Sequence, residues 1–161
     1  MISLNLKSIT DEIFALTALR AAVTAADPEL LPPLLSRDNL PALRVAVSAA
    51  FSTLVSRLAV YVADATFDDS TAGQSPFSSQ QEMTLNIDFG LYAYQLNAGQ
   101  TMALKRNLEH ILALLVLEKA YLPFDVAIAS DKASEAAELI SSIIAILTPA
   151  DSPSIITPIY L

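Results

Sequence analysis

The stretch Glu82-Met83-Thr84-Leu85-Asn86-Ile87-Asp88-Phe89 decides what kind of fold this chain can have, because it alternates apolar and polar side chains. A period of two residues is typical of a β-strand with one buried face. Most of the remaining sequence follows the three- and four-residue spacing of helices. The sequence therefore predicts one short strand, at residues 82–89, in a mainly helical protein.

A solitary strand needs hydrogen-bond partners for its backbone amides and carbonyls, either within its own chain or on another chain. Tyr92, Tyr94 and Leu96 are spaced as in a second short strand that would complete a β-hairpin. The C-terminal arm, residues 149–161, is the other candidate mate, because its prolines prevent a helix while its apolar side chains favour docking. The pattern predicts these interaction residues: Met83, Leu85, Ile87, Phe89, Ile155, Ile156, Ile159 and Tyr160.

Composition limits the remaining possibilities. The chain has 161 residues, 53% of them apolar, which suits a single domain with a sizeable core over residues 1–161. It has no cysteine, so disulfides, thiolate zinc sites and thiol nucleophiles are excluded. A net charge of -8 argues against nucleic acid as a partner. The first residues lack the pattern of a signal peptide, and we expect a cytoplasmic protein.

Helical periodicity and capping residues predict four helices. Short polar side chains are suited to begin them, because they accept hydrogen bonds from the free amides of a first turn: Ser8, Asp38 or Asn39, Asn97 and Ser130. The expected fold is mainly α, a four-helix bundle-like domain with one short strand or hairpin and an extended C-terminal arm. The predicted helices cover residues 8–26, 39–65, 98–122 and 130–147.

The third predicted helix is apolar on every side of its middle turns. Leu112, Leu114, Val116 and Leu117 complete a girdle around the stripe that begins at Leu104. Only a helix with neighbours on several sides stays soluble with such a surface. We therefore expect this helix at the centre of the bundle.

The span Val45–Ala63 raises the alternative of a membrane helix, since Arg57 is its only charge. An arginine near the centre of a bilayer costs about 2.5–3.5 kcal/mol, and the span also contains several hydroxyl side chains. A helix in the centre of a soluble bundle is equally apolar. We therefore predict a buried helix and no membrane span.

The chain offers few groups for catalysis. His110 is the only histidine, and spacing assigns it neither a substrate pocket nor an orienting carboxylate. Asp131, Glu135 and Glu138 fit the acidic first turn of a helix better than a carboxylate site. We predict no enzyme, no catalytic residue, no cofactor and no metal.

The expected function is therefore interaction: an oligomeric assembly or adaptor component that binds itself or another protein, with a homo-oligomer expected. Bundled helices with an extended excursion and an extended arm resemble small helical connector or adaptor proteins of tailed-phage particles, which implies a role in particle assembly and assigns no residue. The alternative is a helical module that binds an apolar ligand between the second, third and fourth helices, with Phe51, Met102 and Tyr121 in the site.

Overall fold

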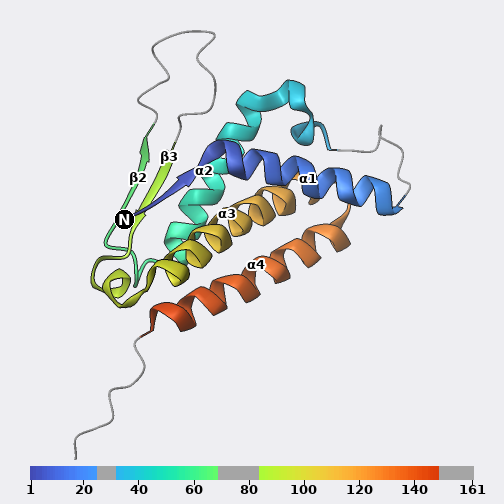
Figure 1. The fold of residues 1–161 in the computed structure, drawn as a ribbon. Helices are drawn as coiled ribbons and strands as arrows, with labels where there is room; N and C mark the ends of the chain where they lie inside the picture. Colours follow the sequence, from blue (N-terminus) through green and yellow to red (C-terminus); the bar gives the residue numbers. More distant parts are fainter. Residues whose placement is uncertain (25–31, 69–83, 149–161) are drawn as a thin grey trace, which may run out of the picture.

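The computed structural model describes residues 1–24, 32–68 and 84–148. Four long helices and a small antiparallel sheet make up this part of the chain, so the mainly α fold class is confirmed (Figure 1). The helices are α1 (Leu6–Thr24), α2 (Leu40–Arg57), α3 (Ala98–Tyr121) and α4 (Val126–Leu147).

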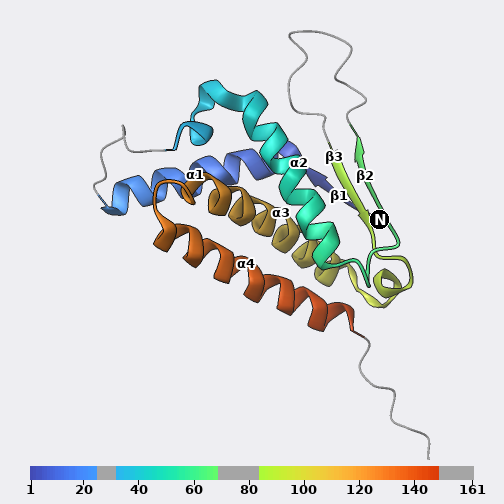
Figure 2. The same ribbon diagram turned by 180° about the vertical axis from the view of Figure 1, so that it is seen from behind.

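Helix α3 is the centre of the molecule, as its apolar girdle predicts. It packs against α1, α2 and α4, and every residue from Ile111 to Leu117 is buried. Helices α1 and α4 flank α3 on one side of the molecule (Figure 1), and α2 crosses it on the opposite side (Figure 2). The hydrophobic core therefore lies around α3 on several sides.

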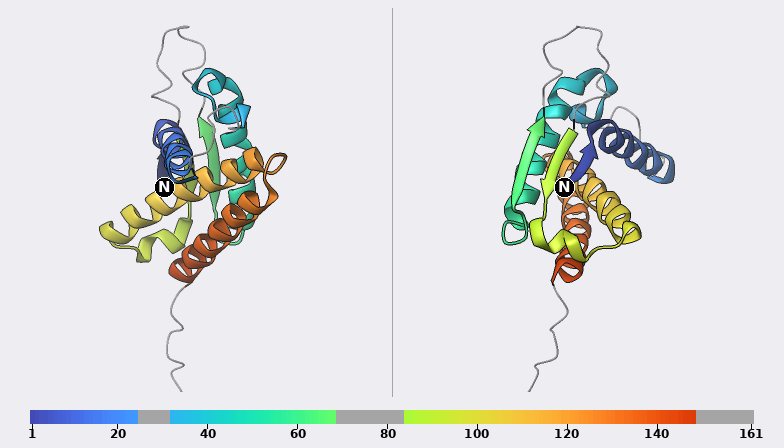
Figure 3. Two further views of the ribbon diagram at one scale, coloured as in Figure 1. Left: turned by 90° about the vertical axis from the view of Figure 1, so that its right-hand side faces the viewer. Right: turned by 60° about the vertical axis from the view of Figure 1, so that its left-hand side comes forward.

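The predicted strand forms as β3 (Thr84–Asp88), and it lies in the middle of a three-stranded sheet. Its neighbours are β1 (Ile2–Asn5) and β2 (Asp64–Asp68), both antiparallel to it (right panel of Figure 3). Ser3 and Thr66 both pair with Asn86 in register. The mates differ from the two candidates that the sequence suggested, because β1 and β2 occupy both edges of β3.

The segment after β3 also differs from the prediction. Residues Gly90–Gln95 form the 3-10 helix η5 instead of a second strand of a hairpin. Gly90 has a φ of 52°, in the left-handed region that favours glycine, and a Cβ there would lie 3.1 Å from the Cβ of Ala63. The chain turns at this residue, which ends the extended backbone.

Several helix boundaries shift for local reasons. Helix α1 begins at Leu6 because the side chain of Asn5, not Ser8, accepts the hydrogen bond from Lys7 N (2.8 Å). Helix α4 begins at Val126 because its cap is Asp125, five residues before the predicted cap Ser130. Asp125 Oδ1 accepts a hydrogen bond from Ile128 N (3.1 Å).

Helix α2 ends at Arg57, whereas the sequence predicts a helix to residue 65. Leu58 closes it with a backbone hydrogen bond to Leu54, and a turn then leads into β2. The helical spacing of Leu58, Tyr61 and Ala65 hides this end in the sequence. The span Val45–Ala63 is thus not one helix, and within the described ranges no helix combines the length and apolar character needed to cross a membrane.

The cap of α3 confirms its prediction. Asn97 Oδ1 accepts from Gln100 N (2.8 Å), and Gln100 Oε1 accepts from Asn97 N (2.9 Å). This reciprocal pair is a capping box, which satisfies two amides that the helix itself cannot pair. Met83 and the arm at 149–161 lie outside the described residues, and so do residues 25–31.

Candidate interaction surface and helix-lined cleft

The predicted interaction residues of the strand belong to the protein's own core. Leu85, Ile87 and Phe89 are buried, because they point to the face of the sheet that packs on the helices. The other predicted residues, Met83, Ile155, Ile156, Ile159 and Tyr160, lie outside the described part of the chain. The strand therefore offers no apolar interaction face of its own.

An exposed aromatic surface lies beside the sheet instead. The 3-10 helix η5 carries Tyr94, which is 85% exposed, and Leu91, which is 80% exposed. Residues three apart are nearly eclipsed in a 3-10 helix, so these two side chains lie on the same side of η5. We call Met1, Leu91 and Tyr94, with the hollow described next, the Tyr94 surface.

A hollow of about 330 Å³ adjoins Tyr94. Met1 from the start of the chain, Ala93 and Leu96 from the η5 region, and Thr101 from the first turn of α3 contribute to its lining. Tyr94 is part of the same rim, so a projecting aromatic side chain and a recess lie next to each other.

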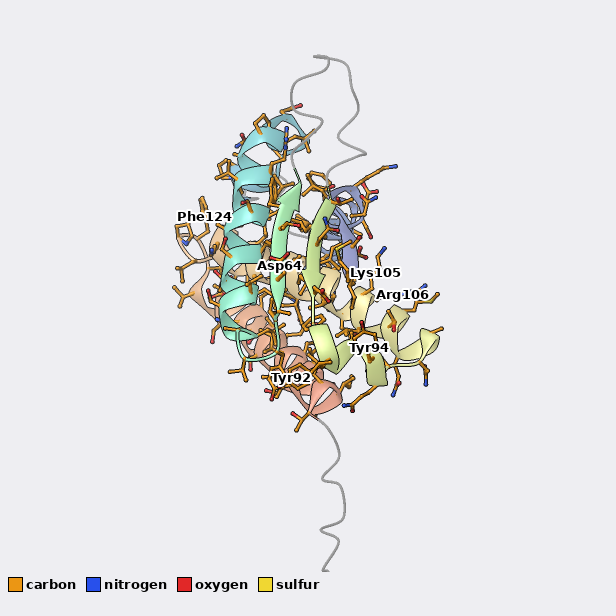
Figure 4. All side chains as sticks on the ribbon, turned by 90° about the vertical axis from the view of Figure 1, so that its left-hand side faces the viewer. Asp64, Tyr92, Tyr94, Lys105, Arg106 and Phe124 are labelled. Atoms are coloured by element: carbon orange, nitrogen blue, oxygen red, sulfur yellow. The ribbon has the colours of Figure 1, made fainter. Side chains whose placement is uncertain are left out.

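The only adjacent basic pair of the chain is on the same side of the molecule. Figure 4 shows Lys105 and Arg106 on α3 above Tyr94, with Asp64 further along the sheet. On this side of the molecule, two cations of α3 thus accompany the exposed aromatic and aliphatic side chains of the Tyr94 surface.

A second recess lies between α1, α3 and α4 and has a volume of about 280 Å³. Leu16 and Leu19 of α1, Leu117 of α3 and Ile128 of α4 supply apolar lining. Thr17, Arg20, Tyr121 and Lys132 complete it. We call this recess the Arg20 cleft.

Tyr121 forms part of the cleft lining beneath a cation. The guanidinium carbon of Arg20 lies 5.5 Å from the centroid of the Tyr121 ring, within the range of a cation–π contact. Tyr121 is only 5% exposed, and its hydroxyl has no hydrogen-bond partner among the residues that the structure describes. Burial raises the pKa of this hydroxyl, although the Arg20 charge opposes the shift. The hydroxyl is therefore a neutral donor at neutral pH.

A chain of polar contacts joins the three helices next to the cleft. His110 Nδ1 on α3 lies 2.5 Å from Glu12 Oε1 on α1, and its Nε2 lies 3.5 Å from Glu135 Oε1 on α4. Lys132 Nζ donates to Glu135 Oε2 at 2.8 Å. This hydrogen bond from Lys132 lowers the pKa of the Glu135 carboxyl, and burial opposes the shift.

This arrangement gives His110 an orienting carboxylate, Glu12, that sequence spacing did not assign. A general base also needs a ring nitrogen directed at a substrate, whereas both nitrogens of His110 face carboxylates. The contacts therefore serve to tie α1, α3 and α4 together. No group of histidine and acidic side chains in the described ranges has an arrangement that could hold a metal ion.

Only part of the predicted ligand site comes together. Tyr121 lines the Arg20 cleft, but Phe51 lies in the core and Met102 is exposed on the first turns of α3. The cleft involves α1 where α2 was expected. The sequence did not predict a role for Arg20 and Lys132, because each is a single basic residue on an amphipathic helix. No local pattern shows that the two flank one recess.

The sequence did not predict the Tyr94 surface, for a different reason. Tyr92, Tyr94 and Leu96 alternate as in a strand, and the glycine at position 90 was the one local sign of a turn.

Comparison with protein-family models, with curated proteins and with solved structures gives no match to this chain.

Proposed function

We propose that this protein is an assembly component that forms a homodimer through the Tyr94 surface. The observation that carries the proposal is the exposure of Tyr94 and Leu91 beside a recess. Tyrosine, methionine and arginine are enriched in protein interfaces, and binding energy concentrates in such aromatic anchors. A cytoplasmic, non-enzymatic role belongs to the same proposal.

The geometry suits a two-fold axis. In a symmetric dimer the same patch of both subunits meets itself, so each side must carry both the projecting group and the recess that receives it. Tyr94 and the hollow of about 330 Å³ are neighbours on one surface. In the proposed dimer, Tyr94 of each protomer enters the hollow of the other.

The expected affinity is moderate. A standard interface buries about 800 Å² on each partner, and the Tyr94 surface alone is a small group of side chains. The net charge of -8 on each protomer also opposes association at low salt. We therefore expect a dissociation constant on the order of 10 μM, and dimerisation that strengthens as salt screens the repulsion.

Analytical ultracentrifugation over a range of concentrations tests the proposal. Tyr94→Ser should weaken dimerisation by about tenfold or more, since aromatic anchors commonly contribute above 1 kcal/mol. Phe124→Ser is the matched control, because Phe124 is also an exposed aromatic residue, 60% exposed, and lies away from Tyr94 (Figure 4). The control should dimerise as the unchanged protein does.

Two results contradict the proposal. The unchanged protein could sediment as a monomer at concentrations well above the expected dissociation constant. Alternatively, Tyr94→Ser and Phe124→Ser could dimerise equally well, which would place the contact elsewhere. The role in particle assembly implied by the broad arrangement of elements stays a prediction.

A further inference from the structure

The Arg20 cleft differs in charge from the rest of the molecule. The chain has 17 acidic and 9 basic residues, yet the two charged residues in the cleft lining are both cations, Arg20 and Lys132. They come from two different helices, α1 and α4. Glu135, which is outside the lining, pairs with Lys132 and offsets part of this charge, so the lining is positive only locally.

Apart from Thr17 and the hydroxyl of Tyr121, the rest of the lining is apolar. Leu16, Leu117 and Ile128 contribute side chains from all three helices around the recess. Its volume of about 280 Å³ is near the lower limit of small-molecule sites. The cleft therefore suits a small, slender molecule with an apolar body.

The positions of both cations are fixed by neighbours. Arg20 stands over the ring of Tyr121, and Lys132 is held by Glu135 at 2.8 Å. Glu135 in turn faces His110, which contacts Glu12. Prearranged cations lose less side-chain freedom on binding an anion than mobile ones do. A guanidinium also presents a fork of donors that matches the two oxygens of a carboxylate.

The Tyr121 hydroxyl adds a third, independent observation. It is a buried donor without a partner in the described part of the chain, and an unpaired buried donor is unfavourable. Tyr121 also lines the cleft. A ligand oxygen that reached this donor would give it an acceptor.

We propose that the Arg20 cleft binds a small monocarboxylate with an unbranched apolar tail, of the medium-chain fatty acid class. The carboxylate pairs with Arg20 and Lys132 at the rim, and the tail lies against Leu16, Leu117 and Ile128. This site is separate from the Tyr94 surface, so it is independent of the proposed dimer.

Isothermal titration calorimetry on the full chain with sodium decanoate tests the proposal. A ligand of this size with good contacts should bind with a dissociation constant of about 10–100 μM. Decanol has the same tail without the charge and should bind about tenfold more weakly, because it cannot form a charge-assisted hydrogen bond. Acetate has the same head without the tail and should show no measurable binding.

Two variants locate the site. Arg20→Leu should weaken decanoate binding by about tenfold while it leaves decanol binding within about twofold. Arg57→Leu is the matched control, because Arg57 is an exposed arginine at the end of α2, away from the cleft. Lys132→Gln is a second variant at the rim in case Arg20→Leu does not fold, and it should weaken decanoate binding in the same direction.

The proposal fails if decanoate does not bind at millimolar concentration, or if decanol binds as tightly as decanoate. It fails equally if Arg57→Leu weakens decanoate as much as Arg20→Leu does, since the effect would then come from net charge. None of these outcomes depends on whether the protein is a dimer.

Discussion

Glu109 is the buried acidic side chain that joins the start of α1 to α3. It is only 7% exposed. Its Oε1 accepts from the backbone amide of Asn5 (3.1 Å), and its Oε2 accepts from the hydroxyl of Ser8 (3.1 Å). Both donors belong to the junction of β1 and α1, where the partial positive charge of a helix N-terminus favours an anion. The carboxylate of Glu109 is thus satisfied by two donors at this junction.

Glu109→Ala should destabilise the fold by about 2–3 kcal/mol, because it leaves two donors without their charged acceptor. Glu109→Gln should cost less, since an amide oxygen still accepts one of the two bonds. Urea unfolding followed by circular dichroism measures both. Glu138→Ala removes an exposed carboxylate of α4 and is the control, with an expected change within about 0.5 kcal/mol. Equal losses for Glu109→Ala and Glu138→Ala would contradict this role.

The pair of Lys132 and Glu135 predicts a dependence of stability on pH. The pKa of Glu135 is lower in the folded protein than its ordinary value, chiefly because Lys132 donates to it. A carboxyl with a lowered folded pKa stabilises the fold above its unfolded pKa, about 4.3, and loses that contribution as the pH falls through the folded value.

Lys132→Met should therefore flatten the fall in melting temperature below about pH 4.3. Melting curves from pH 3 to pH 7 of the unchanged and variant proteins provide the measurement. At pH 7, the reference point, the Glu135 carboxyl is ionised in both proteins. Parallel curves across the acid range would show that the pair contributes nothing to the acid response.

Contacts between residues that are close in sequence were predictable, and contacts between residues far apart in sequence were not. The capping box of Asn97 and Gln100 spans three positions and follows from side-chain chemistry alone. The contact of Asn5 with Glu109 joins positions 104 apart. Glu109 has the spacing of a surface ion pair with Lys105 on the same helix, so only the packing of α1 against α3 shows why it is buried.

The secondary-structure elements show the same difference: those with a clear pattern of their own were predictable, and those that depend on distant partners were not. Strand β3 was predictable because five residues alternate cleanly. The sequence did not predict its two neighbours. Strand β1 has only four residues, with Ile2 and Leu4 on the inner face, and β2 continues the helical spacing of α2. Short strands carry little pattern of their own, since their stability comes from the partner strand.

Substitutions on the two faces of the sheet should differ in effect. Ile87→Ala removes a fully buried side chain and should cost about 2–4 kcal/mol. Thr66→Ala changes an exposed residue on the opposite face and should alter stability by about 0.5 kcal/mol or less. The free energy of unfolding in urea measures both. Similar losses at the two positions would contradict the assignment of inner and outer faces.

For the whole molecule, the central position of α3 was predictable and the path of the chain around it was not. An apolar girdle of seven consecutive buried residues requires neighbours on several sides, whichever helices provide them. Which helices flank the Arg20 cleft depends on the connections, and periodicity does not report these. The cleft therefore emerged only from the arrangement of α1 and α4 on α3.

Hydrogen exchange should follow this hierarchy. Amides in the middle of α3, from Ile111 to Leu117, should exchange most slowly, since they open only when the whole fold opens. Helix α4 packs mainly on α3 alone and should open at a lower free energy. Native-state exchange with mass spectrometry compares the two. Faster exchange in α3 than in α4 would contradict the central role of α3.

The pairing of β1 with β3 has a consequence for synthesis in the cell. Ser3 donates a hydrogen bond to Asn86, 83 residues later in the chain. At a translation rate of about 5–20 residues per second, the first strand waits roughly 4–17 s for its mate to be made. During that time Ile2 and Leu4 are apolar groups without their sheet, exposed to chaperones at the ribosome. A slow stretch of codons between the two strands would lengthen this exposure and lower the yield of native protein.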